Sequence, residues 1–232
     1  MHVPDGFLDA PTSLATGVVA AAGVAVALRG ARRELDDRTA PMAGLVATFV
    51  FAAQMINFPV GAGTSGHLMG GALAAVLVGP WSAVLCVSVV LLVQALLMAD
   101  GGITALGTNV TLIALVTVTV GWATFVVLRR VLPLRPASVP IAAAVAAFIS
   151  VPSAALVFTG LFAVGGQAPV DLSLVVAAML GWHTLIGLGE AAVTGLVVAS
   201  VMSTRPDLVY GARPLLAVRT LEIRMTRAGA AS

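Results

Sequence analysis

The chain has 232 residues, of which 59% are hydrophobic and only 9% are charged, and its formal net charge at pH 7 is +2. Soluble domains carry roughly 25% charged residues, so this composition excludes an ordinary soluble enzyme, and the apolar excess excludes an intrinsically disordered chain. All twelve basic residues are arginine, and they form no basic patch interleaved with aromatic residues, so we expect no nucleic-acid partner. An integral membrane protein is the class that remains.

Seven apolar segments follow one another along the chain. They cover roughly residues 12–29, 41–58, 67–79, 82–99, 106–128, 139–163 and 174–202. Most approach the length of about 20 residues that crosses a hydrocarbon core. The third has only thirteen residues, about 20 Å of helix, and is either a re-entrant segment or a short span extended by the glycine-rich stretch before it.

The arginines give the predicted orientation. Four lie between the first and second segments, three between the fifth and sixth, and five after the seventh. Seven crossings put all three regions on one side, which the excess of arginine makes the cytoplasm. The sequence therefore predicts an all-α integral membrane protein with seven transmembrane helices and an external N-terminus. We expect residues 1–202 to form the bundle and residues 203–232 an Arg-rich cytoplasmic tail that meets anionic lipid.

Two of the three histidines, His2 and His67, are predicted at the external end of the bundle. The opening residues carry no secretory signal peptide, so we expect the chain to begin at Met1 with a free amine. That amine, the His2 backbone nitrogen and His2 Nδ1 can chelate one metal in a plane, which suits Ni(II), Cu(II) or low-spin Co(II). His67 is the candidate for a fourth nitrogen. The alternative is a polar terminus and an interfacial histidine without a metal.

Four motifs carry a resemblance to a known family. They are MHVPDGFL at 1–8, QMINFPV with GTSGHL within 54–68, VQALL with ADGGITALGTN within 93–109, and the stretch from His183 through IGLGEA to Thr194. In this order they resemble the cobalt/nickel substrate-capture (S) components of energy-coupling factor transporters, the CbiM/NikM family. The resemblance covers residues 1–200.

The resemblance implies a six-helix capture bundle with one additional N-terminal helix. It implies that the Met1 amine, the His2 amide and imidazole, and the His67 imidazole hold Co(II) or Ni(II), with a slight lean to cobalt. The ion is the transported ligand, and no cofactor is expected. The chain itself would be no enzyme, because ATP is hydrolysed by partner subunits.

The partners implied are a transmembrane coupling (T) subunit, two cytoplasmic ATPase subunits and a small two-helix membrane (N) component. We expect that component to be a separate chain, because no apolar segment follows residue 202. The implied location is the cell membrane of a bacterium or archaeon.

Other polar residues are candidates for supporting roles. Asn57, Ser65, Asp100 and Asn109 could orient the ligands, although helix caps and loop hydrogen bonds are equally consistent with them. His183 and Glu190 are seven residues apart and share a helix face, which favours interhelical hydrogen bonds or contact with the coupling subunit over metal ligation.

Three alternatives stay open at this point. Asp100, His183 and Glu190 could form the relay of an ion-coupled secondary carrier. Gly63-Thr64-Ser65-Gly66 fits the G-x-S-G pattern of rhomboid intramembrane proteases, with His183 as the partner of Ser65. A vitamin-binding relative of the same bundle would need an apolar or aromatic cavity.

Overall fold

The computed structural model describes residues 1–34, 39–61 and 64–217. Gly63 of the G-x-S-G pattern and the second half of the expected tail, residues 218–232, lie outside the described residues.

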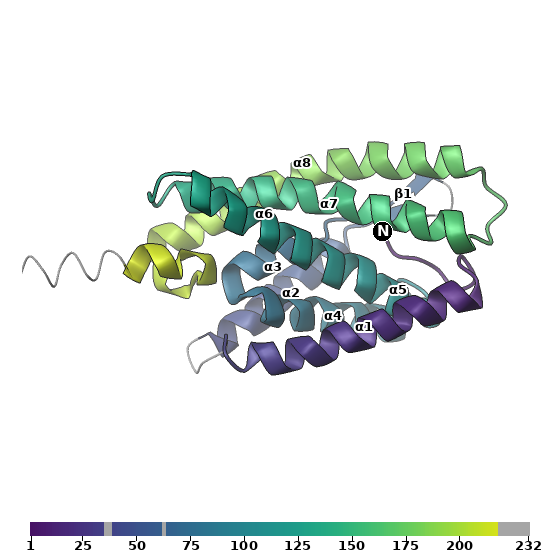
Figure 1. Ribbon diagram of the computed structural model, residues 1–232, viewed down its shortest axis with the longest axis horizontal. Helices are drawn as coiled ribbons and strands as arrows, with labels where there is room; N and C mark the ends of the chain where they lie inside the picture. The colour runs from purple at the N-terminus through teal and green to yellow at the C-terminus, as the bar shows by residue number, and fades with distance from the viewer. Residues whose placement is uncertain (35–38, 62–63, 218–232) are drawn as a thin grey trace, which may run out of the picture.

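Helices aligned along one long axis form the molecule (Figure 1). They are α1 (Ala10–Ala31), α2 (Ala40–Gln54), α3 (Gly71–Val78), α4 (Pro80–Leu97), α5 (Leu106–Asn109), α6 (Thr117–Val131), α7 (Ser138–Gly165) and α8 (Leu172–Thr204). The π-helical segment η1 (Val110–Val116) joins α5 to α6, and the 3₁₀ turns η2 (Pro206–Leu208) and η3 (Tyr210–Ala212) follow α8. A two-stranded antiparallel hairpin, β1 (Phe58–Gly61) with β2 (Thr64–Gly66), lies between α2 and α3.

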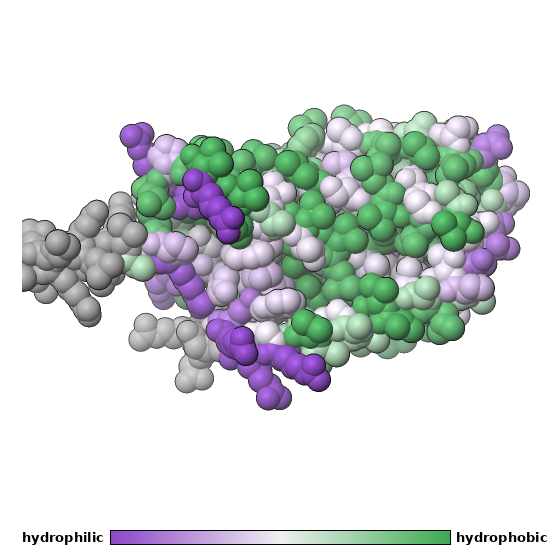
Figure 2. Space-filling view, viewed as in Figure 1, coloured by the Kyte–Doolittle hydropathy of each residue, from purple (hydrophilic) through white to green (hydrophobic). Residues whose placement is uncertain are grey.

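Five helices of the described chain are long and apolar enough to cross a membrane. They are α1, α4, the continuous helix Leu106–Val131, α7 and α8. Hydrophobic residues cover most of the middle of the visible face and hydrophilic residues gather toward its two ends (Figure 2). A multi-pass membrane protein is therefore the class that the structure supports. Helix α2 is apolar but shorter, with 15 residues.

Each of the seven predicted apolar segments contains a helix, but two boundaries were wrong. The second segment was expected to run to residue 58, whereas α2 ends at Gln54 and Phe58 begins β1. Pro59 explains why Phe58 is outside the helix, because a proline lacks a donor and disfavours helical backbone at the residue before it. The third segment shrinks to the eight residues of α3, about 12 Å of helix, every one of them buried.

Two ends of the bundle differ in chemistry. We call the end with the segments 98–105 and 166–171 the loop end; there Thr16 of α1 and Thr108 of α5 are joined by a 2.7 Å hydrogen bond between their hydroxyls. We call the opposite end the arginine end. There the Glu34 carboxylate caps α4, accepting hydrogen bonds from the backbone N–H groups of Trp81 (3.3 Å) and Ser82 (2.7 Å).

The chain after α8 returns to the bundle. The boundary expected at residue 202 falls inside α8, which ends at Thr204. Val209, Ala212 and Leu215 are buried and belong to the hydrophobic core. The first part of the expected tail is thus packed against the arginine end.

Candidate metal site

The first eight residues fold back from the start of α1 into the bundle, so that the N-terminus lies between helices (Figure 1). The side chains of Met1 and Val3 are fully buried. Asn109 fixes this segment through two hydrogen bonds with Val3: the Val3 N–H donates to Asn109 Oδ1 at 2.7 Å, and Asn109 Nδ2 donates to the Val3 carbonyl at 3.1 Å. The Gly102 N–H donates to the same carbonyl at 2.9 Å. The Asn109 amide thus satisfies the backbone N–H and carbonyl of Val3, as a neighbouring β-strand would.

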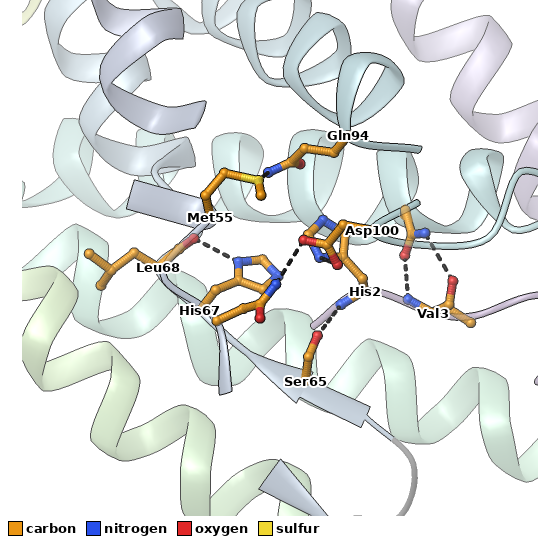
Figure 3. A network of polar contacts seen from close by, with 10 residues as sticks. His2, Val3, Met55, Ser65, His67, Leu68, Gln94 and Asp100 are labelled. Carbon is orange, nitrogen blue, oxygen red and sulfur yellow. Dashed lines mark hydrogen bonds and ion pairs between the residues drawn. The ribbon is translucent and has the colours of Figure 1, made fainter. Parts of the chain in front are cut away.

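His2 is held from three sides (Figure 3). Its ring stacks on the ring of His67, with 4.3 Å between the centroids and 24° between the planes. His2 Nδ1 lies 3.1 Å from Asp100 Oδ1, and the His2 N–H donates to Ser65 Oγ at 3.3 Å. The two histidines predicted as ligands are therefore neighbours, although 65 positions separate them in the sequence.

Asp100 is positioned by its own contacts. Asn57 Nδ2 donates to Asp100 Oδ2 at 2.9 Å, and the Asp100 N–H donates to the Gln94 carbonyl at 3.1 Å. The next residue, Gly101, has φ +88°, and a Cβ there would lie 2.9 Å from Asn109 Nδ2 and 3.3 Å from His2 Cδ2. Only glycine allows the loop to approach His2 so closely.

The tautomer of His67 follows from its contact with the chain. His67 Nδ1 lies 2.8 Å from the Leu68 carbonyl oxygen. A carbonyl only accepts, so Nδ1 carries the hydrogen and Nε2 has a free lone pair. His67 Nε2 is buried and has no hydrogen-bond partner in the described part of the chain. An imidazole lone pair aimed into a buried space is the donor that a transition metal requires.

The charge states of the loop-end groups suit metal binding. Burial lowers the pKa of the Met1 amine well below its ordinary value of 8.0, while the Asp100 carboxylate opposes this shift. The lowered pKa of the Met1 amine favours its neutral form, which is the form that offers a lone pair to a metal. A hydrogen bond from His2 lowers the pKa of Asp100, which keeps that carboxyl ionised.

His183 and Glu190 occupy deeper positions on α8. His183 is fully buried, and its Nδ1 donates to the Met179 carbonyl of the same helix at 2.8 Å. The Glu190 carboxylate accepts from the N–H groups of Met69 at 2.6 Å and Gly70 at 2.8 Å. Glu190 thereby caps the start of α3 and holds the segment that carries His67.

Two further buried amides were missing from the predicted site. Gln54 Nε2 donates to the Met69 carbonyl at 2.8 Å. Gln54 of α2 and Glu190 of α8 therefore both form hydrogen bonds with the backbone of Met69. Gln94 is also fully buried, and its Nε2 lies 3.9 Å from the Met55 sulfur. Both side chains lie close to the end of an apolar helix, and that unfavourable placement is the sequence signal that identifies them.

The hydrogen bonds of the described residues form neither the Ser65–His183 dyad of a protease nor the Asp100–His183–Glu190 relay of a carrier. Ser65 Oγ accepts from the His2 N–H, and no hydrogen bond within residues 1–34, 39–61 and 64–217 joins Ser65 to His183. None of the hydrogen bonds in those ranges connects Asp100, His183 and Glu190 with one another either. Neither the protease dyad nor the carrier relay has its geometry here.

Comparison with known proteins gives a consistent result. A family model described as the cobalt uptake substrate-specific transmembrane region matches residues 2–208. A Haloquadratum walsbyi relative, named as a candidate metal transport protein, is 38% identical over 210 residues, covering 90% of this chain and 94% of its own. The fused nickel transport protein NikMN of Rhodobacter capsulatus is 35% identical over 221 residues, covering 90% of this chain and 64% of the relative.

A solved structure supports the same conclusion. The crystal structure of a truncated transition metal transporter superposes with a TM-score of 0.81 at 28% sequence identity, covering 88% of this chain and 99% of that one. The family match extends over nearly the whole bundle, including the residues that surround His2 and His67. The chain therefore belongs to the CbiM family of substrate-specific transmembrane components for cobalt and nickel transport.

Proposed function

We propose that the protein captures Co(II) or Ni(II) at the loop end through four nitrogens: the Met1 amine, the His2 amide, His2 Nδ1 and His67 Nε2. The observation that carries this proposal is the stacking of His2 on His67, close to the buried N-terminal residue Met1. We lean slightly to cobalt as the physiological ion, since the family is described by cobalt uptake.

Binding rearranges the contacts of His2. Asp100 Oδ1 and Ser65 Oγ lie against the two His2 nitrogens that the chelate uses, at 3.1 Å from Nδ1 and 3.3 Å from the backbone nitrogen. The ion takes over both positions, and the amide gives up its proton on binding. Asp100, Ser65 and, through them, Asn57 then act as positioning residues that hold the His2 ring and the loops around it. Asn109 keeps the N-terminal segment inside the bundle.

The transport cycle requires a membrane orientation and partners. We propose seven crossings, with the loop end outside and the arginine end in the cytoplasm. The third crossing consists of residues 67–70 and helix α3. It starts at His67 near the loop end and finishes at Gly79, which lies beside Glu34 at the arginine end. The ion passes inward when the bundle reorients with a coupling subunit, two ATPases and a two-helix membrane component.

Titration of purified protein with Co(II) and Ni(II) tests the proposed ligand set. We expect one ion per chain, and the absorption spectrum of bound Ni(II) should be that of a planar nitrogen field. His67→Ala should weaken binding at least about 100-fold, because it removes a direct donor. Ser65→Ala, which removes only a positioning contact, should retain tight binding. Equal affinity of wild type and His67→Ala would contradict the proposal.

A further inference from the structure

A second pocket lies at the arginine end, at the opposite end of the bundle from the His2–His67 site. It has a volume of about 410 Å³ and lies between α6 and the chain that follows α8. Its lining residues are Trp122, Phe125, Val126, Arg129, Arg130, Leu134, Tyr210, Gly211, Arg213 and Pro214. The volume falls in the range of small-molecule sites.

The pocket combines an apolar wall with a cationic rim. One face of α6 carries the apolar wall and its first cation. Phe125 and Val126 lie three and four residues after Trp122, and Arg129 lies four and three residues after them. The Trp122 ring stacks on Phe125 with 5.5 Å between centroids and lies 5.6 Å from the Tyr210 ring. Aromatic rings of this kind are enriched where a membrane helix meets the headgroup layer.

The three rim arginines have no carboxylate partner within residues 1–34, 39–61 and 64–217. No acidic residue of that part of the chain lines the pocket, and its ion pairs include neither Arg129 nor Arg130 nor Arg213. Arg129 Nη1 is buried and has no hydrogen-bond partner among the described residues. Arg213 stacks its guanidinium 4.4 Å from the Tyr210 ring centroid and donates to the Glu34 backbone carbonyl at 3.3 Å.

A buried guanidinium nitrogen without an acceptor among the described residues is available to donate a hydrogen bond to an anion. Arginine recognises phosphate through paired N–H donors, and the aromatic and aliphatic wall provides a surface for an acyl chain. We propose that this pocket binds an anionic phospholipid. Arg129 is the principal contact of the lipid phosphate, and an acyl chain of the lipid lies along Trp122 and Val126.

Fluorescence quenching tests this site directly. Trp81→Phe and Trp182→Phe leave Trp122 as the single tryptophan. The protein is placed in vesicles with phosphatidylglycerol or phosphatidylcholine that is brominated near the headgroup. We expect phosphatidylglycerol to be preferred at Trp122 by about fivefold for each arginine engaged.

Arg129→Gln should remove this preference. Arg135→Gln is the matched control, because it removes one positive charge from an exposed position at the same end outside the pocket, and it should keep the preference. If Arg129→Gln fails to fold, Arg130→Gln, which changes an exposed residue of the same pocket, replaces it.

Three outcomes would overturn the proposal. Equal quenching by the two lipids in the parent protein would mean that the pocket holds no anionic lipid. An equal loss of preference in Arg129→Gln and Arg135→Gln would mean that general surface charge attracts the lipid. A change of Trp122 emission caused by inorganic phosphate in phosphatidylcholine vesicles, without a lipid preference, would assign the site to a soluble anion.

Discussion

At the scale of single residues, the metal site depends on how closely backbone and side chains approach His2. The loop that carries Asp100 can come this near only because Gly101 has a positive φ and no side chain. Gly101→Ala should therefore displace His2 and lower the affinity for Co(II) about 10-fold or more. Calorimetric titration measures this change.

Gly6→Ala is the control for backbone strain. Gly6 has φ +74°, but no atom lies within 4 Å of the position of its Cβ. Both variants carry a similar strain of about 1–2 kcal/mol, so both should unfold at lower temperature, but only Gly101→Ala should lose metal affinity. Equal affinities of the two variants would show that the Gly101 approach does not position His2.

The burial of the amine predicts how many protons metal binding releases. The lowered pKa of the Met1 amine favours its neutral form, so the ion displaces fewer protons from this amine than from an exposed one. Calorimetry in buffers of different ionisation heat measures the number of protons released per ion at about pH 7.5. A free peptide with the same first residues should release more, because its exposed amine is still largely protonated.

The pH dependence has the corresponding sign. As the pH falls through the lowered pKa of the Met1 amine, protons compete for that nitrogen and the affinity for the ion decreases more steeply. Release of as many protons per ion from the protein as from the free peptide at the same pH would contradict the lowered pKa of the amine.

At the scale of elements, two buried acids cap two helix starts. Glu190 caps α3 near the site, and Glu34 caps α4 at the far end. Glu190→Gln and Glu34→Gln should each cost about 1–3 kcal/mol of stability, because one backbone N–H of each pair faces a donor instead of an acceptor. Thermal unfolding in detergent measures this loss.

The two variants should differ in metal binding. Glu190 holds Met69 and Gly70, next to the segment that carries His67, so Glu190→Gln should also weaken Co(II) binding. Glu34→Gln should leave the affinity unchanged, because Glu34 lies at the arginine end. Unchanged affinity in both variants would show that the α3 cap does not position His67.

The sequence predicted the helices better than the segments between them. Long apolar runs predicted α1, α4, α7 and α8, because a span must satisfy its backbone hydrogen bonds internally whatever its neighbours are. It did not predict the β1–β2 hairpin or the shortness of α3. The late start of α3 depends on long-range contacts, since residues 69–70 are held by Gln54 and Glu190 from other helices.

The same difference applies to the site. His2 and His67 could be named from residue type and from the family resemblance, and the structure stacks them. The position of Asp100 against His2 Nδ1 could not be derived, because it depends on the conformation of the loop through Gly101. Gln54 and Gln94 went unassigned because a single polar residue in an apolar run indicates burial but not its partner.

At the scale of the whole molecule, the separation of the loop end from the arginine end predicts opposite exposure across the membrane. Cys86 is the single cysteine, so Cys86→Ala provides a background for labelling. In intact cells, an impermeant thiol reagent should modify Gln167→Cys, between α7 and α8, and not Ala137→Cys, before α7. Both positions are exposed. Labelling of Ala137→Cys alone would reverse the proposed orientation.

The central claim is that the N-terminal amine is a metal ligand, and one measurement tests it most directly. Co(II) and Ni(II) titrations compare the native chain with a chain that carries one additional residue before Met1 and keeps every side chain. The account predicts tight binding by the native chain and its loss in the extended chain, because the amine is moved out of the chelate. Equal binding by both chains would contradict it, and the ion would then require a site built without the amine.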